Sequence, residues 1–223
     1  MNVFRIRLLL DFLAVALIIA CLAYWWLDNL FHELFGTALF ALVIMHNVFN
    51  RRWYGSVTKR KVDATRIVNL VTIFCLAIGM LVMLVTSLLV SRDLFPFTAL
   101  SGAFAVREIH MFGGYWVLLI VSIHLGTRWE VVMNAFRATF RLQPNAVRAW
   151  VARILALVVA AWGVKSFSEM ALGSKLMLTY SLDMWDFNES TLEFFINYLS
   201  IVGLFAAVTH YGLFSVRWIR ASL

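Results

Sequence analysis

The sequence predicts an all-α, polytopic membrane bundle of six transmembrane helices, and three observations support this fold class. The 223 residues are 63% hydrophobic and only 14% charged, and the mean hydropathy is +0.86. The apolar residues gather in six stretches, each long enough to cross a bilayer as a helix. The only prolines, Pro96 and Pro144, lie between these stretches, so no predicted span contains a helix breaker. We therefore interpret residues 1–223 as a single membrane domain.

The expected spans are, in chain order, 8–27, 30–50, 67–90, 103–128, 150–172 and 191–216. The first span follows basic residues, as the apolar part of a signal peptide would. It lacks a small-residue cleavage site, however, and ends at the aromatic run Tyr24-Trp25-Trp26, which is typical of an interfacial anchor. We interpret it as a retained helix in which Arg7 and Asp11, four residues apart, pair on one face.

Two of the connections between spans, 130–143 and 173–190, have a distinctive residue pattern. Residues 130–143 place apolar and basic side chains at helical spacing, which predicts an extension of the fourth span or an interfacial helix at the cytoplasmic surface. Residues 173–190 form the longest connection on the opposite side and are net acidic. The latter segment is expected to cap the bundle, to meet a partner or to be an ordinary loop.

The basic residues predict the orientation. With the N-terminus in the cytoplasm, fifteen of the 19 basic residues fall on the cytoplasmic side and nine of the 12 acidic residues on the other. Every connection then obeys the positive-inside rule, with both termini cytoplasmic. The net charge of +7 is thereby explained by membrane topology, so a nucleic-acid partner is not expected. The two cysteines, Cys21 and Cys75, are expected to be unpaired spectators within apolar runs.

Four of the five histidines close two apolar runs of equal length: HELFGTALFALVIMH, from His32 to His46, and HMFGGYWVLLIVSIH, from His110 to His124. Fourteen residues of α-helix advance about 21 Å and turn about 1400°, close to four full turns. Each pair therefore shares one helix face. Because both spans run from outside to inside, His32 and His110 are expected near the outer surface, and His46 and His124 near the inner surface.

Two imidazoles facing each other across an apolar gap are the axial ligands that haem iron accepts. The sequence thus predicts two haem b groups, with the four histidines as iron ligands. Hydrogen bonding between helices and proton relay are the alternatives for intramembrane histidines. Zinc or copper would require further ligands, for which Glu33 and Glu108 are the nearby acids.

Small residues near the histidines are candidates for contact with the porphyrin ring. Gly36, Gly113 and Gly114 follow the first histidine of each run by three or four residues, and the missing side chains would admit a flat ring. Close packing between helices explains the same glycines equally well.

Cations are expected where haem propionates meet the interface. Arg107 is the candidate at the outer site, and Arg51, Arg52 and Arg128 are candidates at the inner site, although all could instead determine topology. The fifth histidine, His210, has no mate at the same spacing and is expected to pack, to bond a neighbour or to assist protonation at a quinone site.

The segments HELFGTALFALVIMHNVFNRRWY and REIHMFGGYWVLLIVSIHLGTRW resemble the bacterial diheme membrane cytochrome b domains and, more distantly, the b subunit of cytochrome bc complexes and the ferric reductases. The resemblance covers residues 8–130 and implies that the first four spans form a diheme four-helix core, with two additional transmembrane helices in 150–218. The chain has neither a flavin or nicotinamide domain nor a proline-bearing quinol loop of the bc type.

The resemblance implies electron transfer across the bacterial cytoplasmic membrane, between the quinone pool and a redox partner protein. A membrane reductase or oxidase acting at an exposed haem, on ferric iron or superoxide, is the first alternative. A haem-free transporter or assembly subunit that uses the histidines as a proton or metal path is the second. The lipid bilayer is a partner in every case.

Overall fold

The computed structural model describes residues 3–56, 63–179 and 184–222, and every regular element in them is helical. In chain order the elements are α1 (Val3–Leu22), α2 (Asn29–Asn50), η1 (Arg51–Ser56), α3 (Ala64–Val90), η2 (Pro96–Thr98), α4 (Phe104–Thr139), α5 (Ala146–Glu169), α6 (Leu172–Lys175) and α7 (Thr191–Ser222). The all-α prediction is therefore confirmed for the described residues.

Polar caps mark the starts of three long helices. The carboxylate of Asp28 accepts from the backbone N–H of Phe31 at the start of α2, and Asp63 does the same for Arg66 at the start of α3. The side chain of Asn145 caps α5. Each cap satisfies a backbone donor that the helix itself leaves unpaired, so these helices begin close to the predicted boundaries.

Five helices, α2, α3, α4, α5 and α7, are long and apolar enough to cross a membrane. Helix α1 is not among them, because its 20 residues include Arg5, Arg7 and Asp11. A multi-pass membrane arrangement is thus supported by five helices, and a sixth span in α1 stays a prediction. Helix α4 has 36 residues, so the predicted extension beyond 128 is continuous helix as far as Thr139.

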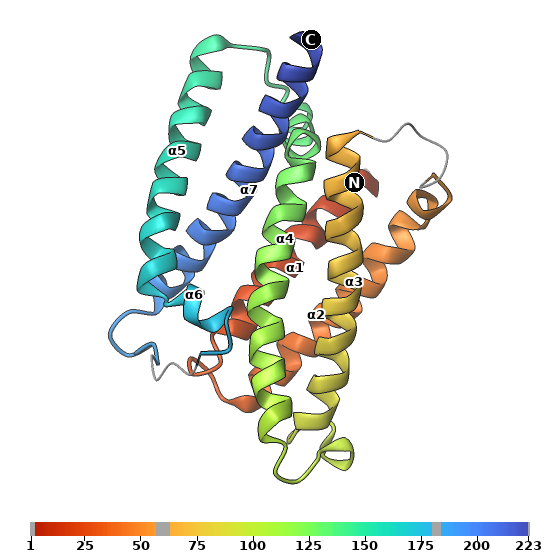
Figure 1. The fold of residues 1–223 in the computed structure, drawn as a ribbon, viewed down its shortest axis with the longest axis vertical. Helices are drawn as coiled ribbons and strands as arrows, with labels where there is room; N and C mark the ends of the chain where they lie inside the picture. The colour runs from red at the N-terminus through yellow and green to blue at the C-terminus, as the bar shows by residue number, and fades with distance from the viewer. Residues whose placement is uncertain (1–2, 57–62, 180–183, 223) are drawn as a thin grey trace.

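The long helices pack as two groups, α1 to α4 and α5 with α7, which are joined by the contact between α4 and α7 (Figure 1). Helix α1 packs on α2 and α4, α3 packs on α4, and α7 joins α4 to α5. Two glycines allow the approach of α7: a side chain at Gly126 would meet the carbonyl oxygen of Ala206 at 2.5 Å, and one at Gly163 would meet the carbonyl oxygen of Ser200. Small residues permit such backbone contact between membrane helices.

Helix α2 is held differently from the rest of the bundle. Its close backbone neighbour is α1, and over the described residues its backbone makes no comparably extensive contact with α3 or α4. In the view of Figure 1, α2 passes behind α4 and α3 near its start and diverges from both toward its end. A space between the two histidine-bearing helices is therefore left for side chains or a ligand to fill.

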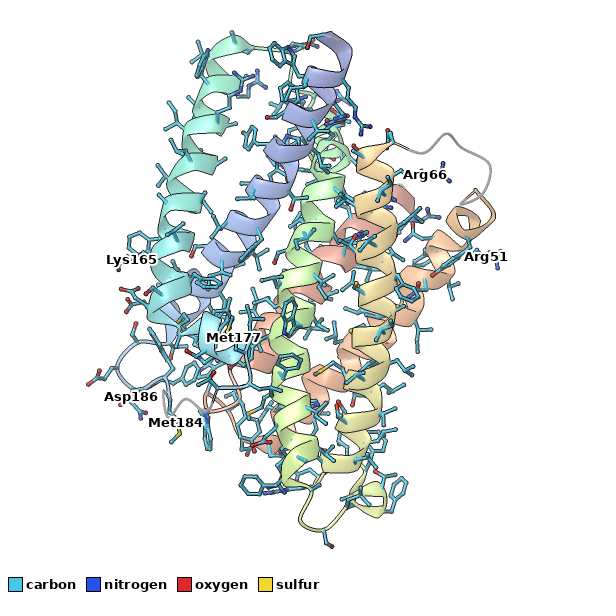
Figure 2. All side chains as sticks on the ribbon, in the orientation of Figure 1. Arg51, Arg66, Lys165, Met177, Met184 and Asp186 are labelled. Carbon is cyan, nitrogen blue, oxygen red and sulfur yellow. The ribbon has the colours of Figure 1, made fainter. Side chains whose placement is uncertain are left out.

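The chain alternates direction through the long helices, so α1, α3 and α5 begin, and α2, α4 and α7 end, toward one end of the bundle (Figure 1). Arg51 and Arg66 lie toward this end and Asp186 toward the opposite end (Figure 2). We call these the basic end and the acidic end.

The segment after α5 closes part of the acidic end. Leu172 is fully buried, the carbonyl oxygen of Leu176 accepts from the indole N–H of Trp116 at 3.2 Å, and Phe187 packs on Phe194 with ring centroids 4.9 Å apart. Of the readings open for residues 173–190, capping of the bundle agrees with the described part of the segment, and residues 180–183 lie outside it. Both cysteines are free, as expected.

Candidate functional site

His32 on α2 and His110 on α4 lie together at the acidic end of the bundle. Their ring centroids are 5.9 Å apart and their planes are inclined at 72°. Two imidazoles that bind one metal ion from opposite sides have ring centres about 6 Å apart, since each metal–nitrogen bond is about 2 Å long. The separation therefore fits one iron between the two rings. We call this pair the outer pair.

The Nδ1 atoms of the outer pair are both occupied by neighbouring helices. His32 Nδ1 lies 3.0 Å from the carbonyl oxygen of Cys21 on α1, which can only accept, so Nδ1 carries the proton. His110 Nδ1 lies 3.0 Å from Thr86 Oγ1 on α3. The Thr86 hydroxyl lies within donating distance of the carbonyl oxygens of Val82 and Met83, so its oxygen can accept from His110 in the tautomer that carries the proton on Nδ1. With both Nδ1 atoms protonated, the Nε2 atom of each ring keeps a lone pair, through which it can bind a metal ion.

Both outer histidines line a cavity of about 830 Å³, within the range of ligand and cofactor sites. Much of its wall is apolar, and Met80, Met83 and Val117 contribute to it. This is the environment that a porphyrin ring requires, and the lining extends to arginines that can pair with carboxylates.

The predicted glycines differ in position. Gly36 and Gly114 line the cavity, and a Cβ added at Gly36 would have no atom within 4 Å. At Gly113 an added Cβ would lie 2.9 Å from Met83 Sδ on α3, and Gly113 is buried. Gly36 and Gly114 are therefore placed to admit a ring, whereas Gly113 is placed for packing between α3 and α4.

The open space beside Gly36 allows its placement in the cavity to be tested by substitution. We expect Gly36→Leu to leave the fold intact, because its side chain extends into open space, and to reduce ligand binding in the cavity at least tenfold by filling it. Cofactor content and thermal unfolding of the purified variant measure the two effects. Gly212→Leu is the matched control, since an added Cβ there also meets nothing within 4 Å but lies outside the cavity lining. Unchanged binding in Gly36→Leu would contradict this placement.

Glu33 fastens α2 to the loop that follows α3. Its carboxylate accepts from Ser91 Oγ and from the backbone N–H groups of Arg92 and Leu94, each at 2.7 Å. It also accepts from the Asn29 amide at 2.8 Å. Because Glu33 directly follows His32 in the chain, these bonds also fix the part of α2 that carries His32. Glu33 is thus engaged in structure rather than free to add a ligand.

The rings of the inner pair, His46 and His124, do not make the ring contact that joins the outer pair. His46 Nδ1 donates to Asp11 Oδ1 of α1 at 2.6 Å, and His124 Nδ1 is buried with no hydrogen-bond partner. His124 lies within electrostatic range of His46, Asp11 and Arg128. Among the described residues no ring contact joins His46 to His124. The structure therefore brings the inner histidines to one region without the close approach of the outer pair.

The predicted pairing of Arg7 with Asp11 is wrong, because the Asp11 carboxylate contacts His46 and no ion pair with Arg7 occurs in the described part of the chain. The Arg7 guanidinium instead lies 5.6 Å from the ring centroid of Phe49. Its Nε is buried and has no hydrogen-bond partner among the described residues. The contact between α1 and α2 explains both placements.

The predicted arginines lie in different surroundings. Arg107 lines the outer cavity, as does Arg92, which the sequence did not single out. Arg128 is exposed, one turn beyond His124 on α4. Arg51 points away from the bundle (Figure 2), which favours a topological role, and the side chain of Arg52 lies outside the described residues.

His210 packs apart from the other histidines, on α7. Its ring lies 5.1 Å from that of the adjacent Tyr211. Glu130 and Arg217 act on it electrostatically and pair with each other at 2.6 Å. Packing, the plainest of the predicted roles, agrees with this position.

No family model, no curated protein and no solved structure matches the chain significantly.

Proposed function

We propose that the protein is a diheme b-type cytochrome that transfers electrons across the bacterial cytoplasmic membrane, with both termini in the cytoplasm. One observation carries the proposal: His32 and His110 stand 5.9 Å apart on a large apolar cavity, with their Nδ1 atoms bonded elsewhere. Interhelical hydrogen bonding alone would not leave two Nε2 atoms free on such a cavity. The resemblance of residues 8–130 to diheme cytochrome b domains agrees with this function.

In this proposal the histidines would bind iron and the arginines would pair with the haem propionates. His32 and His110 would bind the outer iron, and His46 and His124 the inner iron. Arg107 and Arg92 would pair with propionates at the outer site, and Arg7 and Arg128 at the inner site. When bound, the two haems would supply one-electron redox chemistry. The helical rise over fourteen residues, about 21 Å, would let the two sites together span most of a hydrocarbon core of about 30 Å.

The haem content and spectrum of the purified protein test the proposal. We expect b-type bands in the reduced-minus-oxidised difference spectrum and two haems per chain, because each histidine pair provides both axial ligands of one iron. A chain that is expressed with haem available and still shows no such bands would contradict the function.

A second function, reduction or oxidation of a small substrate directly at the outer haem, is favoured by one feature. The cavity lining reaches Trp25 and Met184, whose exposed fractions are 64% and 65%, so the cavity extends to the molecular surface at the acidic end. Turnover of ferric iron or superoxide without quinone would favour this alternative, whereas quinol oxidation coupled to haem reduction would favour exchange with the quinone pool and a redox partner.

A further inference from the structure

The four histidines differ in what holds their Nδ1 atoms. His32 bonds a backbone carbonyl and His110 a threonine hydroxyl, and both acceptors are neutral. His124 Nδ1 has no partner. His46 alone donates to a carboxylate, that of Asp11, and this is the shortest of the three contacts, at 2.6 Å.

The Asp11 carboxylate contacts the His46 ring. His46 of α2 is its contact, and Asp11 also acts electrostatically on His124 of α4. Arg7, one turn earlier on α1, is directed to Phe49 instead. Arg128 acts on His124 from the next turn of α4. Among the described residues no lysine or arginine forms an ion pair with Asp11, and its carboxylate is directed at the His46 ring.

We propose that Asp11 is a positioning residue that fixes the His46 ring and lowers the reduction potential of the inner haem. This inference rests on the proposed function. A carboxylate that accepts the Nδ1 proton makes the imidazole a stronger electron donor through Nε2. A stronger axial donor, together with a nearby negative charge, stabilises the ferric over the ferrous iron. The two haems would therefore differ in potential through a residue that binds neither of them.

Asp11→Asn is the sharpest test, because it keeps the size of the side chain and an acceptor oxygen but removes the charge. We expect the reduction equilibrium of the inner haem to move about tenfold toward the reduced form, which for a one-electron couple is about 59 mV. The outer haem should not move. Potentiometric titration followed by absorbance measures both, and the component lost in His124→Ala identifies the inner haem.

Two matched variants separate this effect from a general change of charge. Glu130→Gln also removes one acid near the basic end, but Glu130 pairs with Arg217 and contacts no haem-ligand histidine, so neither potential should move. Thr86→Val removes the acceptor of His110 Nδ1 and should move only the outer haem. Equal shifts in Asp11→Asn and Glu130→Gln, or an unmoved inner haem in Asp11→Asn, would overturn the inference.

Failure of the inference and failure of the function remain distinguishable. Wild-type protein without haem overturns both, whereas wild-type protein with two haems and no response to Asp11→Asn overturns the role of Asp11 alone. If Asp11→Asn loses only the inner haem and Asp11→Glu retains it at low potential, the positioning role is supported. If both variants lose both haems, Asp11 acts only in folding and the inference fails.

Discussion

Replacing His110 by alanine is expected to abolish the outer haem and to leave the inner haem at least partly occupied. In the proposed function each iron would take two axial imidazoles. The ring centroids of His110 and His32 are 5.9 Å apart, whereas His124 lies fourteen residues further along α4. The haem-to-protein ratio should fall from about two to about one, with loss of one component in the potentiometric titration. His32→Ala should give the same result.

His210→Ala is the matched control for this experiment. It removes an imidazole from a membrane helix, but His210 contacts Tyr211 and not the cavity, so both haems should remain. Loss of the inner component in His110→Ala, with the outer component intact, would refute the pairing of His32 with His110.

Replacing Glu33 by alanine is expected to cause the largest loss of stability. The substitution leaves the backbone N–H groups of Arg92 and Leu94 and the Ser91 hydroxyl without their acceptor. Because Glu33 is partly accessible and water can replace some of these bonds, the expected cost is about 2 kcal/mol. For a chain of this size that corresponds to a fall in Tm of roughly 4–8 °C.

Thermal unfolding in detergent measures this effect, and haem retention at the outer site measures its consequence for the cavity. Glu33→Gln keeps the shape of the side chain but loses the charge, so it should fall between wild type and Glu33→Ala. Glu108→Ala is the control, because Glu108 is an exposed acid at the same end of the bundle. A Tm for Glu33→Ala equal to that of Glu108→Ala would show that the clamp contributes nothing.

The sequence predicted the parts of the site that depend on the geometry of one helix. A separation of fourteen residues places His32 and His46 on one face whatever surrounds them, and the alternation of span direction makes α2 and α4 parallel. These two facts place His32 and His110 at a similar depth, and the packing of α2 beside α4 then brings their rings to 5.9 Å. The continuation of α4 beyond residue 128 followed from the same helical periodicity.

The parts that failed depend on contacts between helices. Asp11 was assigned to Arg7 because the two are neighbours on α1, but the rotation of α1 against α2 brings His46 to the carboxylate instead. The same kind of contact supplies Cys21 and Thr86 to the outer histidines. Helix rotation and tilt are set by side-chain packing across the whole bundle, which no single segment encodes.

The Nδ1 acceptors on α1 and α3 also determine how the protein would meet its cofactor. The rings of His32, His46 and His110 are held by hydrogen bonds to Cys21, Asp11 and Thr86, so they lose their rotational freedom when the protein folds. Iron would then find preorganised donors, and the entropic penalty of assembly at those three ligands would be small. His124, the one imidazole without such a fastening, would be the last ligand to engage, so insertion at the outer site should precede insertion at the inner site.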